Sequence, residues 1–406
     1  MSWKKKFVGN WGQLGMKYNW TTKKLSEIAY INPRESIGKG VVAKKVPMDK
    51  LQPFCRDVPQ FVFEEYKGGT KFRNDDTIMA RITPCLENGK VAKVSILSTD
   101  EIGFGSTEYI VFRAIDGVSD ADFLYYLICS PLVRNPAIKS MVGSSGRQRV
   151  QTDVVANLDV ELPPIEEQRK IGGVLKTFDD KIKLNNEINN NLEQQAQAIF
   201  ANEFLSLETL PEGWKQASLI DIADYLNGLA MQKYRPTADE SGIPVLKIKE
   251  LRQGCCDDNS ELCSPNIKSN YIIHDGDVIF SWSGSLLVDL WCGGICGLNQ
   301  HLFKVTSSKY DKWFYYAWTK HHLDRFVAVA ADKATTMGHI KRDELAKAEV
   351  LIPNKKDYDR IGALLQPIYE MIISNRIENK KLAATRDTLL PKLMNGEIDI
   401  SEVDYE

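Results

Sequence analysis

The sequence lacks the features expected of a membrane or secreted protein. Its 406 residues contain no apolar run long enough to cross a bilayer. The start of the chain carries Lys4, Lys5 and Lys6 but no apolar stretch of the kind a signal peptide requires. We therefore expect a cytoplasmic protein with no membrane partner, in which the eight cysteines are free thiols.

Motifs for nucleotide binding and methyl transfer are also absent. The sequence has neither a Gly-x-x-x-x-Gly-Lys-[Ser/Thr] phosphate loop nor a glycine-rich dinucleotide fingerprint after a strand. It has no Asn/Asp-Pro-Pro-Tyr/Phe string of the kind used by amino-methyltransferases. Asp275 and Asp277 could form a nuclease-like carboxylate pair, but Asp277 has a counterpart in Asp76 at another strand entry, which favours a structural role. A non-catalytic chain is expected.

The cysteine spacing argues against a metal site. Zinc sites use paired knuckles of the C-x2-C type. The clustered cysteines instead have the spacings C-C-x6-C, over Cys255, Cys256 and Cys263, and C-x3-C, over Cys292 and Cys296. We expect buried thiols and no bound metal.

The chain also has little net charge. A formal charge of -2 argues against a protein that coats nucleic acid without regard to sequence. The distribution is uneven, since residues 1–160 carry 23 Lys and Arg against 17 Asp and Glu, whereas residues 206–350 carry 16 against 19. Any DNA phosphates must therefore be met by local basic patches.

What the chain does contain is an internal duplication. Residues 20–200 recur as residues 214–390, and Leu162–Pro163 matches Ile352–Pro353 at an offset of 190 residues. Each copy is large enough for its own hydrophobic core, which excludes a solenoid of short repeats. The sequence predicts an α+β protein with two mixed α/β domains.

A long helix with a 3.5-residue apolar period is predicted at the end of each copy. This period, kept over about four heptads, favours a coiled coil. The first seam is Ile171, Leu175, Phe178, Ile182, Asn185, Asn189, Leu192, Ala196 and Ile199. The second seam is Ile361, Leu365, Ile368, Ile372, Asn375, Asn379, Leu382, Arg386 and Leu389.

Both seams place asparagine at the same two positions. If each helix packs only on its own domain, these side chains are solvated. If the helices instead pair antiparallel about a local two-fold axis, Asn185 should face Asn375, and Asn189 and Asn379 should help to fix the register. About 30 residues give a rod of about 45 Å. This exceeds one turn of duplex DNA, about 34 to 36 Å.

Two polar loops of the first copy are candidates for nucleic-acid contact. The first follows a predicted strand, Thr77 to Ala80, and the second precedes an amphipathic turn that ends at Leu158. Arginine with guanine and glutamine with adenine are favoured major-groove pairs. The candidates are Arg81, Thr83, Asn88 and Lys90 in the first loop, and Ser144, Ser145, Arg147, Gln148 and Arg149 in the second. The alternative is that these are solvated loop residues.

The corresponding loops of the second copy have different side chains. The candidates there are Ser281, Trp282 and Ser283 after the strand, and Lys333, Thr335, Thr336, His339 and Lys341 in the other loop. Matching framework residues with different loop residues are expected of two domains that recognise different DNA sequences. Trp282 could stack on a base, whereas the tryptophans of residues 313–318 are interpreted as core.

Four strings occur in a fixed order in the first copy, namely Thr83–Lys90, Gly105–Tyr109, Gly143–Val150 and Leu162–Ile171. Together they resemble the specificity (S) subunit of type I restriction-modification systems, over residues 16–396. The resemblance is weaker in the second copy, where Pro353-Asn354-Lys355-Lys356-Asp357-Tyr358 replaces the Pro-Pro-x-Glu-Glu-Gln form.

The resemblance implies that two target-recognition domains each read half of a bipartite, asymmetric site in double-stranded DNA. Two methyltransferase subunits would dock on the helices, which set the spacing, and restriction/translocase subunits would join through the complex. S-adenosylmethionine, ATP and Mg would belong to those partners and not to this chain. The implied segments are residues 1–164 and 206–353 for the domains, 165–205 and 354–396 for the helical spacers, and 397–406 for a tail.

A protein-protein scaffold built on the coiled coil, with no role in DNA binding, is the alternative. The near-neutral charge supports it, while the divergent polar loops on a duplicated frame argue against it.

Overall fold

The computed structural model describes residues 19–144, 146–332, 340 and 342–400, and these form two compact units. Unit 1 draws on the chain up to Ile182 and again from Leu382, and unit 2 is Lys183–Lys381. Within the described part of the chain, no helix combines the length and the apolar character that a membrane span needs.

Unit 1 contains three small sheets and four short helices. The sheets have the strand orders β1-β10, β2-β9-β6-β7 and β4-β3-β8-β5. The strands are β1 Thr21–Lys24, β2 Ala29–Ile31, β3 Val42–Val46, β4 Val62–Glu65, β5 Thr70–Phe72, β6 Thr77–Ala80, β7 Val91–Lys93, β8 Gly103–Gly105, β9 Tyr109–Ala114 and β10 Asp159–Leu162. The helices are α1 Leu25–Ile28, α2 Ala121–Cys129, α3 Pro131–Lys139 and α4 Thr152–Ala156.

Unit 2 repeats this topology strand for strand. Its sheets have the orders β11-β20, β12-β19-β16-β17 and β14-β13-β18-β15. The strands are β11 Lys215–Ser218, β12 Asp224–Asn227, β13 Ile243–Leu246, β14 Leu262–Cys263, β15 Ile272–Ile273, β16 Val278–Ser281, β17 Leu287–Leu290, β18 Cys296–Leu298, β19 Leu302–Thr306 and β20 Glu349–Ile352. The helices are α6 Leu219–Ile222, α7 Ile248–Gln253, α8 Lys312–His321, α9 Leu323–Asp332 and α10 Arg342–Ala346.

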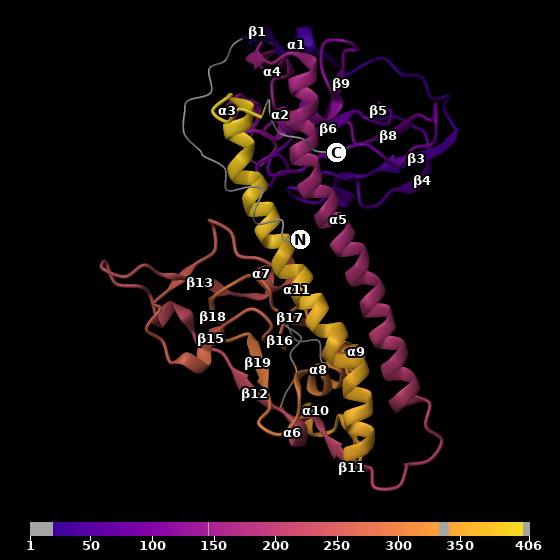
Figure 1. Cartoon of the computed structure of the whole chain (residues 1–406), viewed down its shortest axis with the longest axis vertical. Coiled ribbons are helices and arrows are strands. Elements are labelled where there is room, and N and C mark those ends of the chain that lie inside the picture. The colour runs from indigo at the N-terminus through magenta and orange to yellow at the C-terminus, as the bar shows by residue number, and fades with distance from the viewer. Residues whose placement is uncertain (1–18, 145, 333–339, 341, 401–406) are drawn as a thin grey trace. The chain divides into compact units, whose positions relative to one another are not determined.

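The mixed sheet is alike in both units. The β3–β8 and β13–β18 pairs are parallel, while the other strand pairs are antiparallel. Figure 1 shows this sheet on the side of unit 1 away from α3, and its counterpart in unit 2 on the side away from α8 and α9. The duplication inferred from the sequence is therefore a duplication of structure.

The core of each unit lies between its antiparallel sheet and an aromatic-rich helix. Strand β6 is buried along its whole length, as expected for a continuous apolar run. Phe123 and Tyr126 on α2 are buried, and Trp313 and Tyr316 take the same place on α8. The predicted core role of the residue 313–318 group is thus confirmed.

Two long helices complete the fold, α5 Ile165–Phe200 and α11 Lys355–Met394. Both pack closely on their domains through glycine. A Cβ at Gly172 would lie 2.8 Å from the backbone N of Phe123, and one at Gly362 would lie 3.0 Å from Nε1 of Trp313. Every residue of both predicted seams is buried or half-buried. The sequence pattern therefore identified the packed face of each helix correctly.

The asparagines join the two helices within unit 2. The Nδ2 of Asn185 donates to Oδ1 of Asn379 at 2.8 Å, and that of Asn375 donates to Oδ1 of Asn189 at 2.9 Å. The order of these partners makes the helices antiparallel, and a local two-fold axis exchanges one pair with the other.

The predicted Asn185–Asn375 pair is wrong. The local axis passes between the two asparagines of each helix rather than through the centre of each seam. Each asparagine therefore bonds to the residue one helical turn further along the partner helix.

Candidate nucleic-acid interface

The first candidate loop of unit 1, residues 81–90, is fixed by its own backbone. It begins where β6 ends and contains a cis peptide bond between Thr83 and Pro84. Asn88 N donates to the Pro84 carbonyl at 3.0 Å, and Lys90 N donates to the Cys85 carbonyl at 3.1 Å. The loop therefore presents a defined surface.

The second loop, residues 143–149, lies against the first. The amide of Thr83 donates to the carbonyl of Gln148 at 3.0 Å, and the amide of Val150 donates to the carbonyl of Arg81 at 2.8 Å. Residues more than 60 positions apart in the sequence thus form one surface. The two clusters that the sequence singled out separately are therefore neighbours on the surface of unit 1.

A third segment, the Gly105–Tyr109 string, holds these loops together through Glu108. Its carboxylate accepts three bonds from Arg149, with Nη2 at 2.6 Å and Nε at 3.0 Å from Oε1, and Nε at 3.0 Å from Oε2. The Nε of Arg81 lies 4.0 Å from Oε2 of the same carboxylate. Arg149, by hydrogen bonding, lowers the pKa of Glu108. Glu108 was absent from the predicted site, because nothing local in its string marks it as a partner for residues 41 positions away.

The predicted contact residues of unit 1 differ in their exposure. Asn88, Ser144, Arg147 and Arg149 are exposed, while Arg81, Thr83, Lys90 and Gln148 are half-buried; Ser145 lies outside the described residues. No hydrogen bond or ion pair to the guanidinium of Arg147 is found among the residues that the structure describes.

Lys90 and Thr83 serve the loop itself in this structure. The ammonium of Lys90 donates to the carbonyl of Met48 at 2.8 Å, and the hydroxyl of Thr83 lies 3.5 Å from Sδ of Met141. Their role as donors to DNA stays a prediction.

Unit 2 has Trp282 where unit 1 has Arg81. In unit 2 the amide of Ile340 donates to the carbonyl of Trp282 at 3.0 Å, as that of Val150 does to Arg81 in unit 1. The indole stacks on Phe303, with ring centroids 5.7 Å apart, and its Nε1 donates to Oδ1 of Asn227 at 3.0 Å. The counterpart of a guanidinium is therefore a half-buried indole.

Trp282 borders an open hollow of about 720 Å³. The hollow is lined by Asp224, Tyr225, Leu226, Asn227, Tyr271, Trp282, Phe303, Ile340 and Arg342. Four aromatic rings beside one guanidinium, one carboxylate and one amide give this surface a character unlike that of the arginine-rich loops of unit 1.

The two serines beside Trp282 are buried in this structure. Ser281 is fully buried, and its hydroxyl donates to the carbonyl of Ser285 at 2.8 Å. Ser283 is buried as well, with its hydroxyl 3.0 Å from Nδ1 of His301. Both hydroxyls hold the turn after β16. Lys333, Thr335, Thr336, His339 and Lys341 lie outside the described residues.

The sequence matches the family described as "Type I restriction modification DNA specificity domain" twice, over residues 17–194 and 211–384. The chain belongs to this family of specificity subunits. The two matched ranges coincide with the two structural repeats and extend into both long helices.

Relatives within the family cover most of this specificity subunit. The type I restriction enzyme MjaIX specificity subunit of Methanocaldococcus jannaschii is 27% identical over 313 residues, which is 71% of either chain. The HindI specificity subunit of Haemophilus influenzae is 22% identical over 370 residues, 72% of this chain and 81% of the relative. The crystal structure of an S subunit from M. genitalium is 14% identical, covers 94% of this chain and 98% of that one, and has a TM-score of 0.55, which shows a shared fold.

The fourth string of this specificity subunit anchors a helix. Gln168 accepts a bond from the amide of Asp120 at 2.9 Å, and Glu167 accepts one from Nε1 of Trp20 at 3.0 Å. In unit 2 the hydroxyl of Tyr358 accepts the amide of Asp311 at 2.8 Å, and Asp357 accepts Nε1 of Trp214 at 2.9 Å. The departure from the Pro-Pro-x-Glu-Glu-Gln form therefore preserves these two hydrogen bonds with other side chains.

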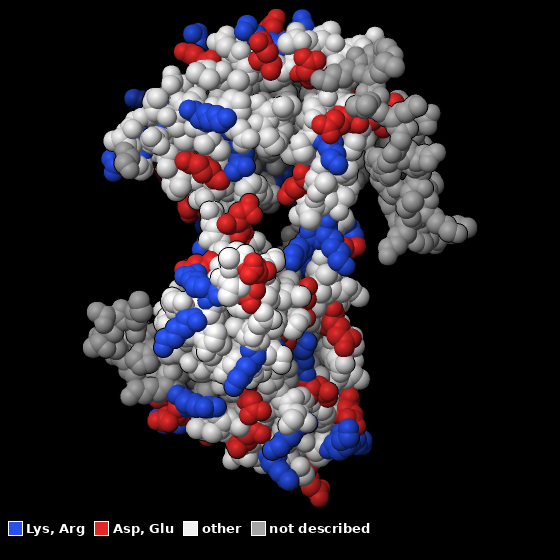
Figure 2. Space-filling model, turned by 90° about the vertical axis from the view of Figure 1, so that its left-hand side faces the viewer, with Lys and Arg blue, Asp and Glu red and all other residues white. Residues whose placement is uncertain are grey.

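A polar cavity of about 610 Å³ lies at the opposite end of β6 from the loops. Five carboxylates and three guanidiniums are among its lining groups, namely those of Glu35, Asp75, Asp76, Asp116, Asp120, Arg73, Arg113 and Arg169. The excess of carboxylates makes it a poor site for phosphate. Figure 2 likewise shows acidic and basic side chains mixed on the visible face of each unit.

The described residues contain no cluster of three or more His, Cys, Asp or Glu side chains arranged to hold a metal ion. The eight cysteines are free thiols. Asp76 and Asp277 have the same structural role, because each accepts the amide three residues before it, those of Arg73 and His274, at the entry to its strand.

Proposed function

We propose that this chain is the DNA-recognition subunit of a type I restriction-modification complex, in which unit 1 and unit 2 each read one half of a bipartite, asymmetric site in double-stranded DNA. The observation that carries the proposal is the equivalence of the two sites. In both units the residue that follows the central strand accepts the same backbone bond, from Val150 in unit 1 and from Ile340 in unit 2, yet this residue is Arg81 in one and Trp282 in the other.

A shared frame with unlike side chains is suited to reading unlike sequences. Base identity is read by side chains at the groove edges, whereas contacts with phosphates fix only position. In unit 1, Arg147 is exposed and Gln148 half-buried, and these residue types pair with guanine and adenine respectively. In unit 2 an indole beside an aromatic hollow offers stacking and contact with apolar base edges instead.

The long helices are suited to setting a spacing. Helix α5 has 36 residues and α11 has 40. At about 1.5 Å per residue these lengths are about 54 and 60 Å, which exceeds one turn of duplex DNA at about 34 to 36 Å. Their exposed faces would dock two methyltransferase subunits, and through the complex the restriction/translocase subunits.

Chemistry is assigned to those partners. The sequence offers no nucleotide-binding or methyltransferase motif, and Asp277, one of the two carboxylates that could have suggested a nuclease, accepts a backbone amide at a strand entry. S-adenosylmethionine, ATP and Mg would therefore be bound outside this chain.

Selection of random duplex DNA by the chain in complex with its methyltransferase subunits tests the proposal. One bipartite, asymmetric site should be enriched, and its affinity should fall steeply as salt rises. If no sequence is enriched, sequence-specific DNA recognition is refuted and the protein-protein scaffold is favoured.

Single substitutions assign the half-sites. Arg147→Ala should reduce preference at one position of one half-site by about 5- to 150-fold, which corresponds to about 1–3 kcal/mol. Trp282→Ala should relax only the other half-site. Arg169→Ala is a matched control, because this exposed arginine is bound to Glu166 on α5 and its loss should leave both preferences unchanged. If Arg147→Ala and Trp282→Ala relax the same half-site, one-unit-one-half reading is wrong.

A further inference from the structure

The duplication creates a problem of partner choice for the long helices. Because α5 and α11 are copies, each could in principle pair with its equivalent in a second copy of the chain instead of with the other. The asparagines do not prevent this, since both helices carry them at the same positions. The side chains that differ between the two seams must therefore distinguish the partners.

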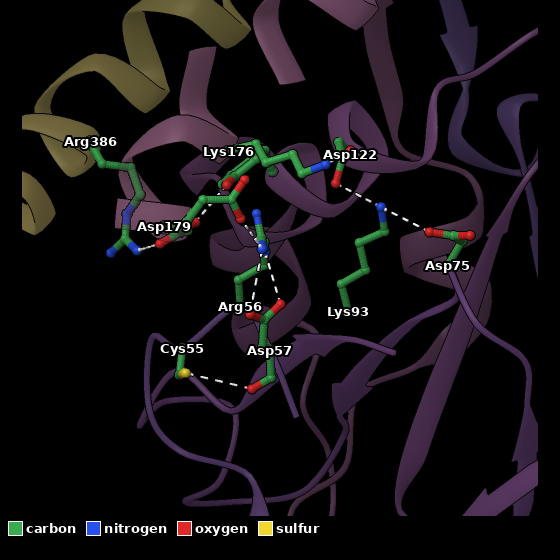
Figure 3. A network of polar contacts seen from close by, with 11 residues as sticks. Cys55, Arg56, Asp57, Asp75, Lys93, Asp122, Lys176, Asp179 and Arg386 are labelled. Atoms are coloured by element: carbon green, nitrogen blue, oxygen red, sulfur yellow. Dashed lines mark hydrogen bonds and ion pairs between the residues drawn. The ribbon is translucent and has the colours of Figure 1, made fainter. Parts of the chain in front are cut away.

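In unit 1 the contact between the helices is a buried ion pair. Asp179 of α5 accepts a hydrogen bond from Nη1 of Arg386 of α11, and both residues are 7% exposed (Figure 3). The hydroxyl of Tyr126 donates to the other oxygen of Asp179 at 2.5 Å. Arg386 also binds Asp387 on its own helix at 2.8 Å. Asp179 is thus the only carboxylate that reaches Arg386 from α5 among the described residues.

In unit 2 the equivalent positions are uncharged. At the offset of 190 residues, Tyr369 stands for Asp179, Ala196 for Arg386 and Tyr316 for Tyr126. Tyr316 and Tyr369 pack edge to face, with ring centroids 5.0 Å apart, and Ala196 is buried in the same cluster. Equivalent positions are therefore occupied by a buried ion pair in unit 1 and by packed aromatic and alanine side chains in unit 2.

Two further ion pairs between the helical segments have the same polarity. Arg376 of α11 donates to Glu193 of α5 at 3.0 Å. Arg360 of α11 binds Glu203, just beyond the end of α5, through Nη1 at 2.8 Å and Nη2 at 2.7 Å. In all three pairs the acid comes from the first copy and the base from the second.

We propose that Asp179–Arg386, supported by Glu193–Arg376 and Glu203–Arg360, selects the pairing of α5 with α11 over the pairing of either helix with its equivalent in a second copy of this chain. This selection concerns assembly and does not depend on the proposed function.

Self-pairing would remove these partners between the helices, although Arg376 would keep Asp289 and Arg386 would keep Asp387 within the second half. Between two α11 helices, Arg386 would face Tyr369, Arg376 would face Ala383 and Arg360 would face Leu393. Between two α5 helices, Asp179 would face Ala196 and Glu193 would face Asn186, although Glu203 would meet Lys170. Leaving one partner of a buried charge pair alone is strongly unfavourable, and charged residues beside a helix seam set partner choice in this way.

The test uses the full chain with a protease site inserted between Glu208 and Thr209, which are exposed. The folded chain is cut, incubated in dilute urea with a copy whose first half carries a mass tag, and examined by native mass spectrometry. The cut wild-type chain should contain only pairs of a first half with a second half. Pairs of two first halves or two second halves in statistical proportions would overturn the proposal.

A symmetrised variant then tests the cause. Asp179→Tyr with Arg386→Ala gives unit 1 the residues that unit 2 already uses, so the fold should survive while the preference is lost and self-pairs appear. Arg56→Ala is the matched control, because this buried arginine binds Asp180 within the first half, at 2.5 Å. Its loss should leave every first half paired with a second half.

A second variant covers the case in which the first does not fold. Glu193→Ala with Arg376→Asn symmetrises a pair whose side chains are 29% and 27% exposed, with less disturbance of the core. Self-pairs should also appear in this variant. If a folded symmetrised variant still forms only pairs of a first half with a second half, the charges do not select the partner and the proposal is wrong.

Discussion

Replacement of Arg386 by alanine tests the energetics of the helix contact. The substitution leaves the carboxylate of Asp179 buried with the Tyr126 hydroxyl as its remaining hydrogen-bond donor among the described residues. Removing one member of a buried ion pair typically costs about 3–5 kcal/mol. We expect a loss of this size in the free energy of unfolding of unit 1 at neutral pH.

The loss should depend on pH in a direction set by Asp179. Burial raises the pKa of this carboxyl, while Arg386 opposes the increase. Without Arg386 the folded-state pKa rises further above the unfolded value. The folded state of the variant then tolerates Asp179 at low pH, where the carboxyl is protonated, and its free energy of unfolding falls as pH rises through the folded pKa. The cost of Arg386→Ala should therefore be smaller at pH 5 than at pH 7.

The assay is urea unfolding at both pH values, with hydrogen exchange of residues 171–182 and 382–394 to report on unit 1 alone. Arg169→Ala, which removes an exposed ion pair with Glu166, should change stability by at most about 1 kcal/mol. Asp179→Tyr with Arg386→Ala should be close to neutral, because well-packed apolar residues often replace a buried pair without loss. A cost below about 1 kcal/mol for Arg386→Ala, or one independent of pH, would refute this reasoning.

Three other substitutions probe the fold. Burial lowers the pKa of His322 to about 4, so its neutral ring contributes at most about 3 kcal/mol of stability above pH 6.5, which should be lost as pH falls from about 6.5 to 4. A pH series of thermal melts should show this loss for the wild-type chain but not for His322→Gln. Gly172→Ala should lower the melting temperature despite its better helix propensity, because the new Cβ would lie 2.8 Å from the backbone N of Phe123. Asn375→Leu alone should cost about 1–3 kcal/mol by leaving Asn189 unpaired, whereas changing both to Leu should be neutral or stabilising in denaturant titration.

The parts of the fold that repeat at short range could be predicted from the sequence. The seams of both helices were read correctly, because burial on one face imposes a period that any window of the sequence displays. The strand at residues 77–80 was found for a similar reason, since its full burial gives a continuous apolar run. These features depend only on neighbours along the chain.

Contacts between distant residues were not predictable in this way. The Asn185–Asn379 bond depends on where the local axis crosses the two helices, which the periodicity of each helix alone does not reveal. The meeting of the two loops of unit 1, and the role of Glu108 between them, depend on how β6 and β9 are paired in the sheet. The bond from the Ser281 hydroxyl to its own turn was not predictable either, because a hydroxyl after a strand looks the same in sequence whether it bonds to that turn or faces solvent.

The pairing of β1 with β10, and of β11 with β20, has a consequence for how such chains change. In each unit the first strand of the globular part is bonded to the last, with Thr21 opposite Leu162 and Lys215 opposite Ile352. The chain therefore enters and leaves each domain at the same two-stranded ribbon. A domain whose ends meet can be removed and another inserted with little strain on what remains. The ribbon is thus a natural junction for recombination, at which one half of a recognition specificity could be exchanged while the other half is inherited unchanged.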